Sequence, residues 1–277
     1  MSERISLSNQ PVATSQPGDA DYTPPSELVP LPSKGKVYPT DSVFHGVDAV
    51  EIRPMTTRDE DILSSRALLK QGKAIDALLK SCLIQRALVD PSSLLIGDRN
   101  AVLVAIRITG YGAEYKPDVE CPRCDEKSKP QPPFDLSQMV IKPLGADPIV
   151  PGVNAFKFSL PVSRKEVVFK LLTGTDEREL SQTLEQQKKK GAGPMGVEAV
   201  VTTRLWMHIM KIGEEEDKNK LMKIIHGLPP RDSRALSKYI ETISPGINMN
   251  QMFICPACGE GSEVDVPMTV EFFWPTE

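Results

Sequence analysis

The sequence has little of several things that mark common classes of protein. It contains only five cysteines in 277 residues, aromatic residues make up 5% of it, and Lys and Arg (33) do not outnumber Asp and Glu (37). The formal net charge of -4 argues against a protein that coats nucleic acid or an anionic membrane. With this balance of charges, binding to nucleic acid or to an anionic membrane would require a local basic patch.

Long apolar runs are also missing. No stretch approaches the roughly 20 apolar residues that cross a bilayer, and the first ten residues, MSERISLSNQ, contain no apolar core of a secretory signal. We therefore expect a protein that is made in a reducing cytosol and does not insert into a membrane. In that setting, close cysteine pairs indicate metal ligands rather than disulfide bonds.

Proline, by contrast, is abundant. The chain has 25 prolines, nearly twice the common frequency of about 5%, and seven of them lie in residues 1–39. A segment this polar and proline-rich cannot bury enough surface to offset its ordering entropy, so we predict an extended arm over 1–39 that lies on a partner. It should dock at Leu31–Pro39, where Gly35 permits a turn and Tyr38 supplies an amphipathic anchor.

The remainder has the length and the 40% hydrophobic content of a globular body. Apolar alternation predicts short strands over 47–54, 115–120 and 154–160. Helical spacing predicts a helix that begins after Thr56 and further helices over 73–89, 99–109, 197–212 and 214–225. The segment 99–109 is apolar almost all round and should be buried. The expected fold class is therefore α+β, a helix-rich body with short strands.

The two halves of the chain resemble each other. At a constant offset of 134 residues, identical residues correspond in these pairs: Asp98 and Asp232, Ala101 and Ala235, Ile106 and Ile240, Gly112 and Gly246, Cys121 and Cys255, Pro122 and Pro256, Cys124 and Cys258. Upstream, Asp59 and Asp176 are related by 117 residues. We therefore predict two diverged repeats, residues 40–145 and 146–277, each with one Cys-Pro-x-Cys motif.

Four of the cysteines form these two motifs. Cys121 and Cys124 make the first pair, and Cys255 and Cys258 make the second. The two-residue spacing lets both thiolates of a pair bind one ion at about 2.3 Å. Two pairs fill a tetrahedral zinc site and leave no position for water or substrate. The sequence thus predicts a structural zinc ion in a split ribbon that joins the repeats.

Other interpretations of the cysteines stay open. An iron–sulfur cluster fits the ligand count, although the symmetric spacing favours zinc. A thiol redox pair would require a helix N-terminus and a βαβ context, which the strand-turn-strand pattern does not provide. A site without metal is a further alternative. The fifth cysteine, Cys82, lies in an apolar run and is expected to be a buried, unreactive thiol.

No catalytic constellation is apparent. The three histidines, His45, His208 and His226, do not cluster at ligand spacing, and no phosphate-binding loop is present. His208 lies in an apolar helix and is expected to be a packed histidine. We therefore predict a protein that is not an enzyme, with no catalytic residues and no cofactor besides the metal.

The order of several short motifs is similar to that of a known family. The motifs are Leu31–Pro39, Arg53–Glu60, Gly97–Arg99 and Cys121–Cys124. Together, over residues 30–140, they resemble the baseplate hub proteins of T4-like contractile-tailed bacteriophages. The resemblance implies a non-catalytic scaffold that helps to build the baseplate around the central spike and tube, is assembled in the host cytoplasm and resides in the virion tail.

The resemblance also implies the partners. These are other baseplate, hub and tail-tube or spike proteins, with the N-terminal arm on neighbouring subunits and no nucleic acid. The alternative function is a zinc-ribbon adaptor for nucleic acid or the transcription machinery. That alternative predicts a concentrated basic face, whereas the cysteine turns carry Asp125, Glu126, Glu260 and Glu263.

Overall fold

The computed structural model describes residues 25–84, 90–189, 200–266, 268 and 270–273. Over these residues the fold is α+β, as predicted, with helices and small antiparallel sheets of two or three strands. The first 24 residues, which make up most of the predicted arm, lie outside the described residues. No helix in the described part of the chain is long and apolar enough to span a bilayer.

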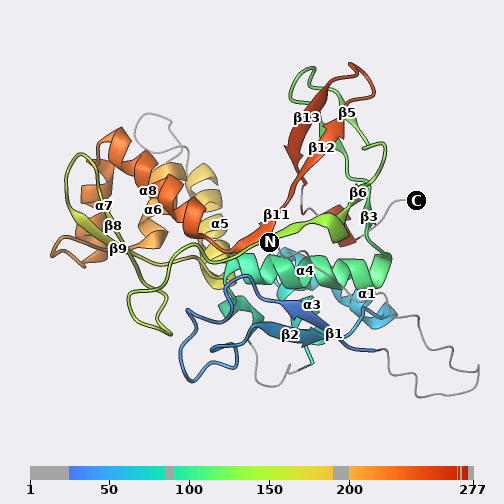
Figure 1. Cartoon of the computed structure of the whole chain (residues 1–277), viewed down its shortest axis with the longest axis horizontal. Coiled ribbons are helices and arrows are strands. Elements are labelled where there is room, and N and C mark those ends of the chain that lie inside the picture. The colour runs from blue at the N-terminus through green and yellow to red at the C-terminus, as the bar shows by residue number, and fades with distance from the viewer. Residues whose placement is uncertain (1–24, 85–89, 190–199, 267, 269, 274–277) are drawn as a thin grey trace, which may run out of the picture.

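The first half begins with a β-hairpin and ends with a cysteine-bearing hairpin. Its elements are β1 (Glu27–Pro30), β2 (Ala49–Ile52), α1 (Thr57–Ser64), α2 (Arg66–Lys70), α3 (Ala74–Cys82), α4 (Ile96–Tyr111), β3 (Glu114–Tyr115), β4 (Val119–Glu120), β5 (Lys127–Ser128), β6 (Phe134–Asp135) and β7 (Val140–Lys142). The helix α4 runs through the middle of the molecule (Figure 1). Its residues 101–107 are all buried, as predicted for the apolar segment 99–109.

The second half also begins with two antiparallel strands and contains a cysteine-bearing hairpin after its last α-helix. Its elements are β8 (Phe156–Ser159), β9 (Glu166–Phe169), α5 (Gly174–Lys189), α6 (Val200–His208), β10 (Ile209–Ile212), α7 (Lys218–His226), α8 (Pro230–Ile243), β11 (Gly246–Asn248), β12 (Asn250–Ile254) and β13 (Gly261–Asp265). Helices α5 to α8 gather at one end of α4, and the hairpin β12–β13 projects from the other side of the body (Figure 1).

In each half, a basic residue and a capping box connect the hairpin to the first helix. In the first half, the backbone N–H and hydroxyl of Thr56 donate to the carboxylate of Asp59, at 2.8 and 2.9 Å. Arg53, which follows β2, donates to the same carboxylate at 2.7 Å. This box satisfies the free N–H groups at the start of α1.

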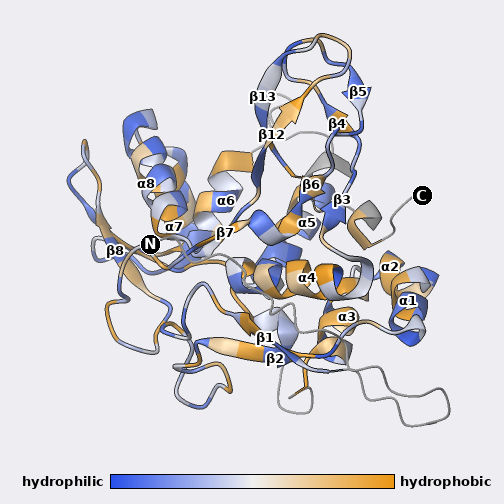
Figure 2. Ribbon diagram, turned by 45° about the vertical axis from the view of Figure 1, so that its right-hand side comes forward, coloured by the Kyte–Doolittle hydropathy of each residue, from blue (hydrophilic) through white to orange (hydrophobic). Residues whose placement is uncertain are grey.

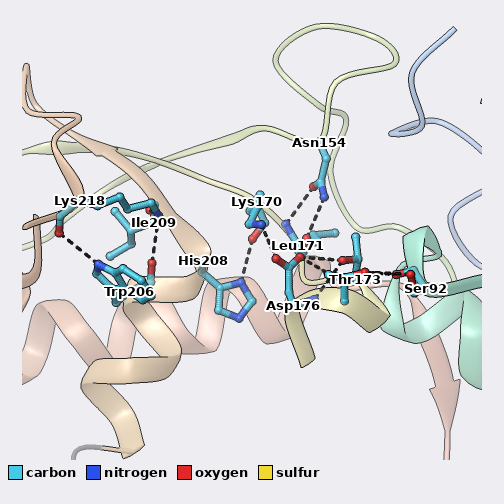
Figure 3. Close-up of polar contacts among 11 residues, drawn as sticks. Ser92, Asn154, Lys170, Leu171, Thr173, Asp176, Trp206, His208, Ile209 and Lys218 are labelled. Carbon is cyan, nitrogen blue, oxygen red and sulfur yellow. Dashed lines mark hydrogen bonds and ion pairs between the residues drawn. The ribbon is translucent and has the colours of Figure 1, made fainter. Parts of the chain in front are cut away.

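The second half makes the same contacts 117 residues later. The backbone N–H and hydroxyl of Thr173 donate to Asp176, both at 2.9 Å, and Lys170 pairs with this carboxylate at 2.6 Å (Figure 3). The backbone hydrogen bonds of the two basic residues also correspond. The N–H of Arg53 donates to the carbonyl of Cys82, and the N–H of Lys170 donates to the carbonyl of His208. These equivalent hydrogen bonds support the predicted repeat.

A buried aspartate starts the last helix of each half. Asp98 is the third residue of α4 and accepts hydrogen bonds from Ser33 and Tyr38 in the turn after β1. Asp232 is the third residue of α8 and accepts from the backbone N–H of Val162, in the turn after β8, at 2.7 Å. A carboxylate in the first turn is favoured by the helix dipole.

The two halves share one hydrophobic core. Strand β7 of the first half pairs antiparallel with β11 of the second, and the N–H of Gly145 donates to the carbonyl of Ile243 at 2.9 Å. One cluster of buried side chains includes residues from the first hairpin, from α4 and from α8. The two halves of the chain therefore pack as one body around α4.

Residues 27–39, part of the predicted arm, are folded into this body. They form β1 and a turn in which Leu31, Val37 and Tyr38 are almost completely buried. Gly35 has φ +68°, which fits the turn expected there. The arm prediction placed the boundary too late, because Pro30 and Pro32 flank a strand end and a turn rather than a flexible segment.

Two helix predictions in the second half are wrong at their boundaries. The predicted helix over 197–212 ends at His208, and Ile209–Ile212 form β10, which pairs with β9. The predicted helix over 214–225 begins only at Lys218, with Asp217 as its N-cap. In both cases pairing and capping in the fold override the helical spacing. Of the predicted helix over 73–89, α3 ends at Cys82, and residues 85–89 lie outside the described residues.

Candidate metal centre

The four paired cysteines meet, although they come from opposite halves of the chain. The sulfurs of Cys121 and Cys258 lie 3.9 Å apart, and those of Cys124 and Cys255 lie 3.7 Å apart. All four Sγ atoms lie within 4.8 Å of one another. The arrangement joins residues that are 131 and 137 positions apart in the sequence.

These distances fit a tetrahedral metal ion. A Zn–S bond of about 2.3 Å in a tetrahedral site requires sulfurs about 3.8 Å apart. The measured separations of 3.9 and 3.7 Å bracket this value. Four thiolates suit soft or borderline ions such as Zn²⁺ or the iron of a cluster. The four cysteines could therefore hold a metal ion.

The two cysteine turns have the same backbone geometry. The N–H of Asp125 donates to the carbonyl of Cys121 at 2.9 Å, and the N–H of Gly259 donates to that of Cys255 at 2.8 Å. Asp125 and Gly259 have φ +58° and +73°, so both turns end in the left-handed region. This shared turn directs both thiols of each pair toward one point.

Backbone N–H groups favour the thiolate form that metal binding requires. The N–H of Arg123 lies 3.4 Å from the sulfur of Cys121. The pKa of Cys255 is lowered to about 7, chiefly because the backbone N–H of Cys258 donates to its sulfur. The lowered pKa favours the thiolate of Cys255, which is the form that binds a metal ion.

Exposure divides each pair in the same way. Cys121 and Cys255 are buried, whereas Cys124 and Cys258 are exposed. An ion can therefore reach the site from solvent on one side while the other side is held by the protein. All four positions of a tetrahedral ion would be occupied by cysteine, which is the pattern of a structural rather than a catalytic site.

The fifth cysteine lies apart from this centre. Cys82 is fully buried at the end of α3, in the hydrophobic core. Burial raises its pKa to about 12. A thiol that stays protonated at neutral pH is neither a nucleophile nor a ligand, as the sequence predicted for this residue.

The histidines do not contribute to a metal site. Nδ1 of His208 donates to the carbonyl of Lys170 at 2.8 Å, and His208, the last residue of α6, is buried (Figure 3). Burial lowers the pKa of His208, so the ring is a neutral packed histidine, as predicted. In the described part of the chain, the four cysteines are the only group of three or more ligand-type residues found close enough to bind an ion.

The sequence did not reveal the cluster around Asp98. Its partners Ser33 and Tyr38 are 65 and 60 residues away along the chain, and no local pattern links them. The Thr-x-x-Asp spacing of the two capping boxes is the local signal that was available, at Thr56 and at Thr173.

Comparison with known proteins supports the resemblance seen in the motifs. Residues 24–148, a little under half of the chain, match the model of a family described as T4 bacteriophage base plate protein. The match spans β1 to β7, including α4 and the first cysteine pair. No curated protein and no solved structure matches the chain.

Proposed function

We propose that this protein is a structural component of a contractile phage tail baseplate, located at the hub or the inner baseplate. The proposal starts from the match of residues 24–148 to the model of the T4 baseplate family. The family match carries the proposal. A baseplate family is one of structural proteins in the virion tail, where other baseplate and tail proteins are the partners. In this role the protein is a non-catalytic scaffold.

The metal centre would stabilise this scaffold. We infer that the ion is zinc, because two symmetric Cys-Pro-x-Cys turns supply four thiolates at tetrahedral spacing. Holding together residues more than 100 positions apart removes much of the conformational freedom of the unfolded chain. The metal would thus fix the two cysteine hairpins relative to each other and to α4.

The proposed partners are hub, tail-tube, spike and other baseplate proteins. Because residues 27–39 belong to the folded body, the proposed arm that contacts neighbouring subunits comprises residues 1–24, which lie outside the described residues. The division into repeats at 40–145 and 146–277 is likewise proposed, and the paired hydrogen bonds of Asp59 and Asp176 support it.

A direct test is to look for the protein in purified tails. Mass spectrometry of tails and of baseplate intermediates from infected cells should find this chain together with baseplate proteins. A phage with a stop codon early in the gene should yield no complete baseplates. Absence of the chain from both tails and intermediates would contradict the proposal.

The alternative of a nucleic-acid adaptor is tested with the same purified protein. A zinc ribbon that reads DNA or RNA binds less tightly as salt rises, because counterions are released on binding. We expect no salt-dependent binding to either, since the four basic residues of the hairpin at 115–132 are matched by four acidic ones and the hairpin at 249–266 contains no Lys or Arg.

A further inference from the structure

The outward face of the second cysteine hairpin is apolar. On β12, Met252 is 67% exposed and Ile254 is 53% exposed, whereas Phe253 between them is fully buried. Alternation along a strand puts Met252 and Ile254 on the same face. Single exposed apolar residues are common, but neighbouring ones on one strand form a patch.

The first cysteine hairpin has charged residues at the same positions. At the offset of 134 residues, Asp118 corresponds to Met252 and Glu120 to Ile254, and both acids are exposed. Val119, which corresponds to Phe253, is buried. The first hairpin therefore forms without apolar residues at these two positions, so a cysteine hairpin of this type does not require them.

The second hairpin is also acidic. Residues 249–266 contain no Lys or Arg and three acids, whereas residues 115–132 contain four basic and four acidic residues. Glu263 lies directly opposite Met252 in the β12–β13 pair, and Asp265 lies opposite Asn250. In the first hairpin, Lys127 pairs with Glu120 at 3.5 Å. The second hairpin thus presents apolar side chains beside a row of negative charge.

This face is positioned to meet another molecule. The hairpin β12–β13 stands away from the body, and β12 carries an apolar segment beside the more polar β13 (Figure 1 and Figure 2). Among the described strands, none pairs with this hairpin from either side. Exposed methionine adapts to varied apolar surfaces, and the negative charge repels nucleic acid.

We propose that this outer face, formed by Met252 and Ile254 of β12 and by Glu263 and Asp265 of β13, binds a segment of a neighbouring baseplate protein that combines apolar and basic residues. The apolar side chains of the segment cover Met252 and Ile254, and its Lys or Arg side chains pair with Glu263 and Asp265. The identity of the neighbour as a baseplate protein rests on the proposed function.

Neutral polar substitutions test this surface. Met252→Gln with Ile254→Thr removes the apolar side chains without placing an acid opposite Glu263, so folding and metal content should be unchanged. Incorporation of this variant into tails should fall at least tenfold. Asp118→Asn with Glu120→Gln, at the corresponding positions of the first hairpin, is the matched control and should assemble normally. Normal assembly of the first variant would overturn the proposal.

Crosslinking identifies what binds. A photo-crosslinking amino acid at position 252 should link, in purified tails, to one segment with Lys or Arg within a few residues of the crosslink. The same group at position 118 is the control and should give none. Links to an acidic segment or to nucleic acid, or no excess over position 118, would overturn the surface while leaving the baseplate role intact if the chain is in the tail. Absence of the chain from tails would overturn both.

Discussion

At the scale of single residues, buried carboxylates connect segments that are distant in sequence. Asp98 is fully buried, and the hydroxyl of Tyr38 donates to it while accepting the backbone N–H of Leu95 at 2.9 Å. A buried polar group is tolerated only when it is hydrogen-bonded. Tyr38 therefore links the turn after β1 to the start of α4.

Removing this hydroxyl should destabilise the protein. In Tyr38→Phe the buried N–H of Leu95 loses its partner, and Oδ2 of Asp98 keeps only the hydroxyl of Ser33, which together cost about 1–3 kcal/mol. The measurement is the free energy of unfolding in urea. Tyr111→Phe is the control, because Tyr111 donates to Glu60 at an exposed site and should cost under about 0.5 kcal/mol. Equal effects of the two changes would contradict this role for Tyr38.

Asp59 should make stability depend on acidity. Burial raises the pKa of Asp59, but hydrogen bonds from Arg53, Ser81 and Thr56 outweigh it and hold the pKa well below its usual range. A carboxylate with a lowered pKa in the folded state stabilises the protein above its unfolded pKa of about 3.9. This stabilisation is lost as pH falls through that value toward the folded pKa.

Urea unfolding at pH 7, 4 and 3 measures this contribution. Asp59→Asn should be less stable than the wild type at pH 7 and should lose less stability on acidification. Asp61→Asn, at an exposed position of the same helix, should leave the pH dependence unchanged. If the free energy of unfolding of Asp59→Asn fell with pH as steeply as that of the wild type, other groups would be the cause of the acid sensitivity.

At the scale of elements, the two cysteine hairpins depend on the ion that we propose they share. Binding at a metal concentration 1,000-fold above the dissociation constant stabilises a fold by about 4 kcal/mol, which corresponds to about 8–16 °C in Tm for a chain of this size. The contribution is lost if one ligand is removed.

Cys121→Ser and Cys255→Ser should each abolish binding of one metal ion per chain and lower the Tm by that amount. Elemental analysis and calorimetry are the measurements. Cys82→Ser should keep the full metal content, because Cys82 lies in the core away from the centre. If elemental analysis found no metal in the wild-type protein, the zinc proposal would fail.

Elements that depend on local sequence were predictable, whereas elements that depend on long-range pairing were not. The cysteine pairs were predictable because the ligand spacing within each turn is local, and their meeting at one site was predictable because a tetrahedral ion needs four ligands and each pair supplies two. The strand β10 could not be predicted, because the apolar spacing of Ile209–Ile212 continues that of the preceding helix. These residues form a strand because they pair with β9. The surface formed by Met252, Ile254, Glu263 and Asp265 could not be predicted either, because it depends on how β12 and β13 are paired.

At the scale of the whole molecule, close backbone contact joins the two halves. A Cβ on Gly97, near the start of α4, would lie 1.9 Å from the carbonyl oxygen of Pro245, which precedes β11. Only glycine permits this approach. The contact lies beside the β7–β11 pair, so it fixes α4 of the first half against a strand of the second.

Gly97→Ala should therefore destabilise the whole body. Separating the two backbones costs about 1–3 kcal/mol or more, as in other overpacked sites. The Tm from calorimetry is the measurement. Gly227→Ala is the control, because a Cβ there would meet its nearest atom at 3.6 Å, an ordinary contact. A Gly97→Ala protein as stable as Gly227→Ala would show that the halves can separate without cost.

The separation of the two cysteine pairs along the chain also sets the order of events during synthesis. A ribosome that adds about 5–20 residues per second makes the second pair roughly 7–27 s after the first, since Cys255 and Cys258 follow Cys121 and Cys124 by 134 residues. Until then only two of the four ligands exist, and a tetrahedral ion cannot be fully bound. Full coordination of the proposed ion therefore requires translation past Cys258, so a chain that ends before this residue would lack part of the metal site.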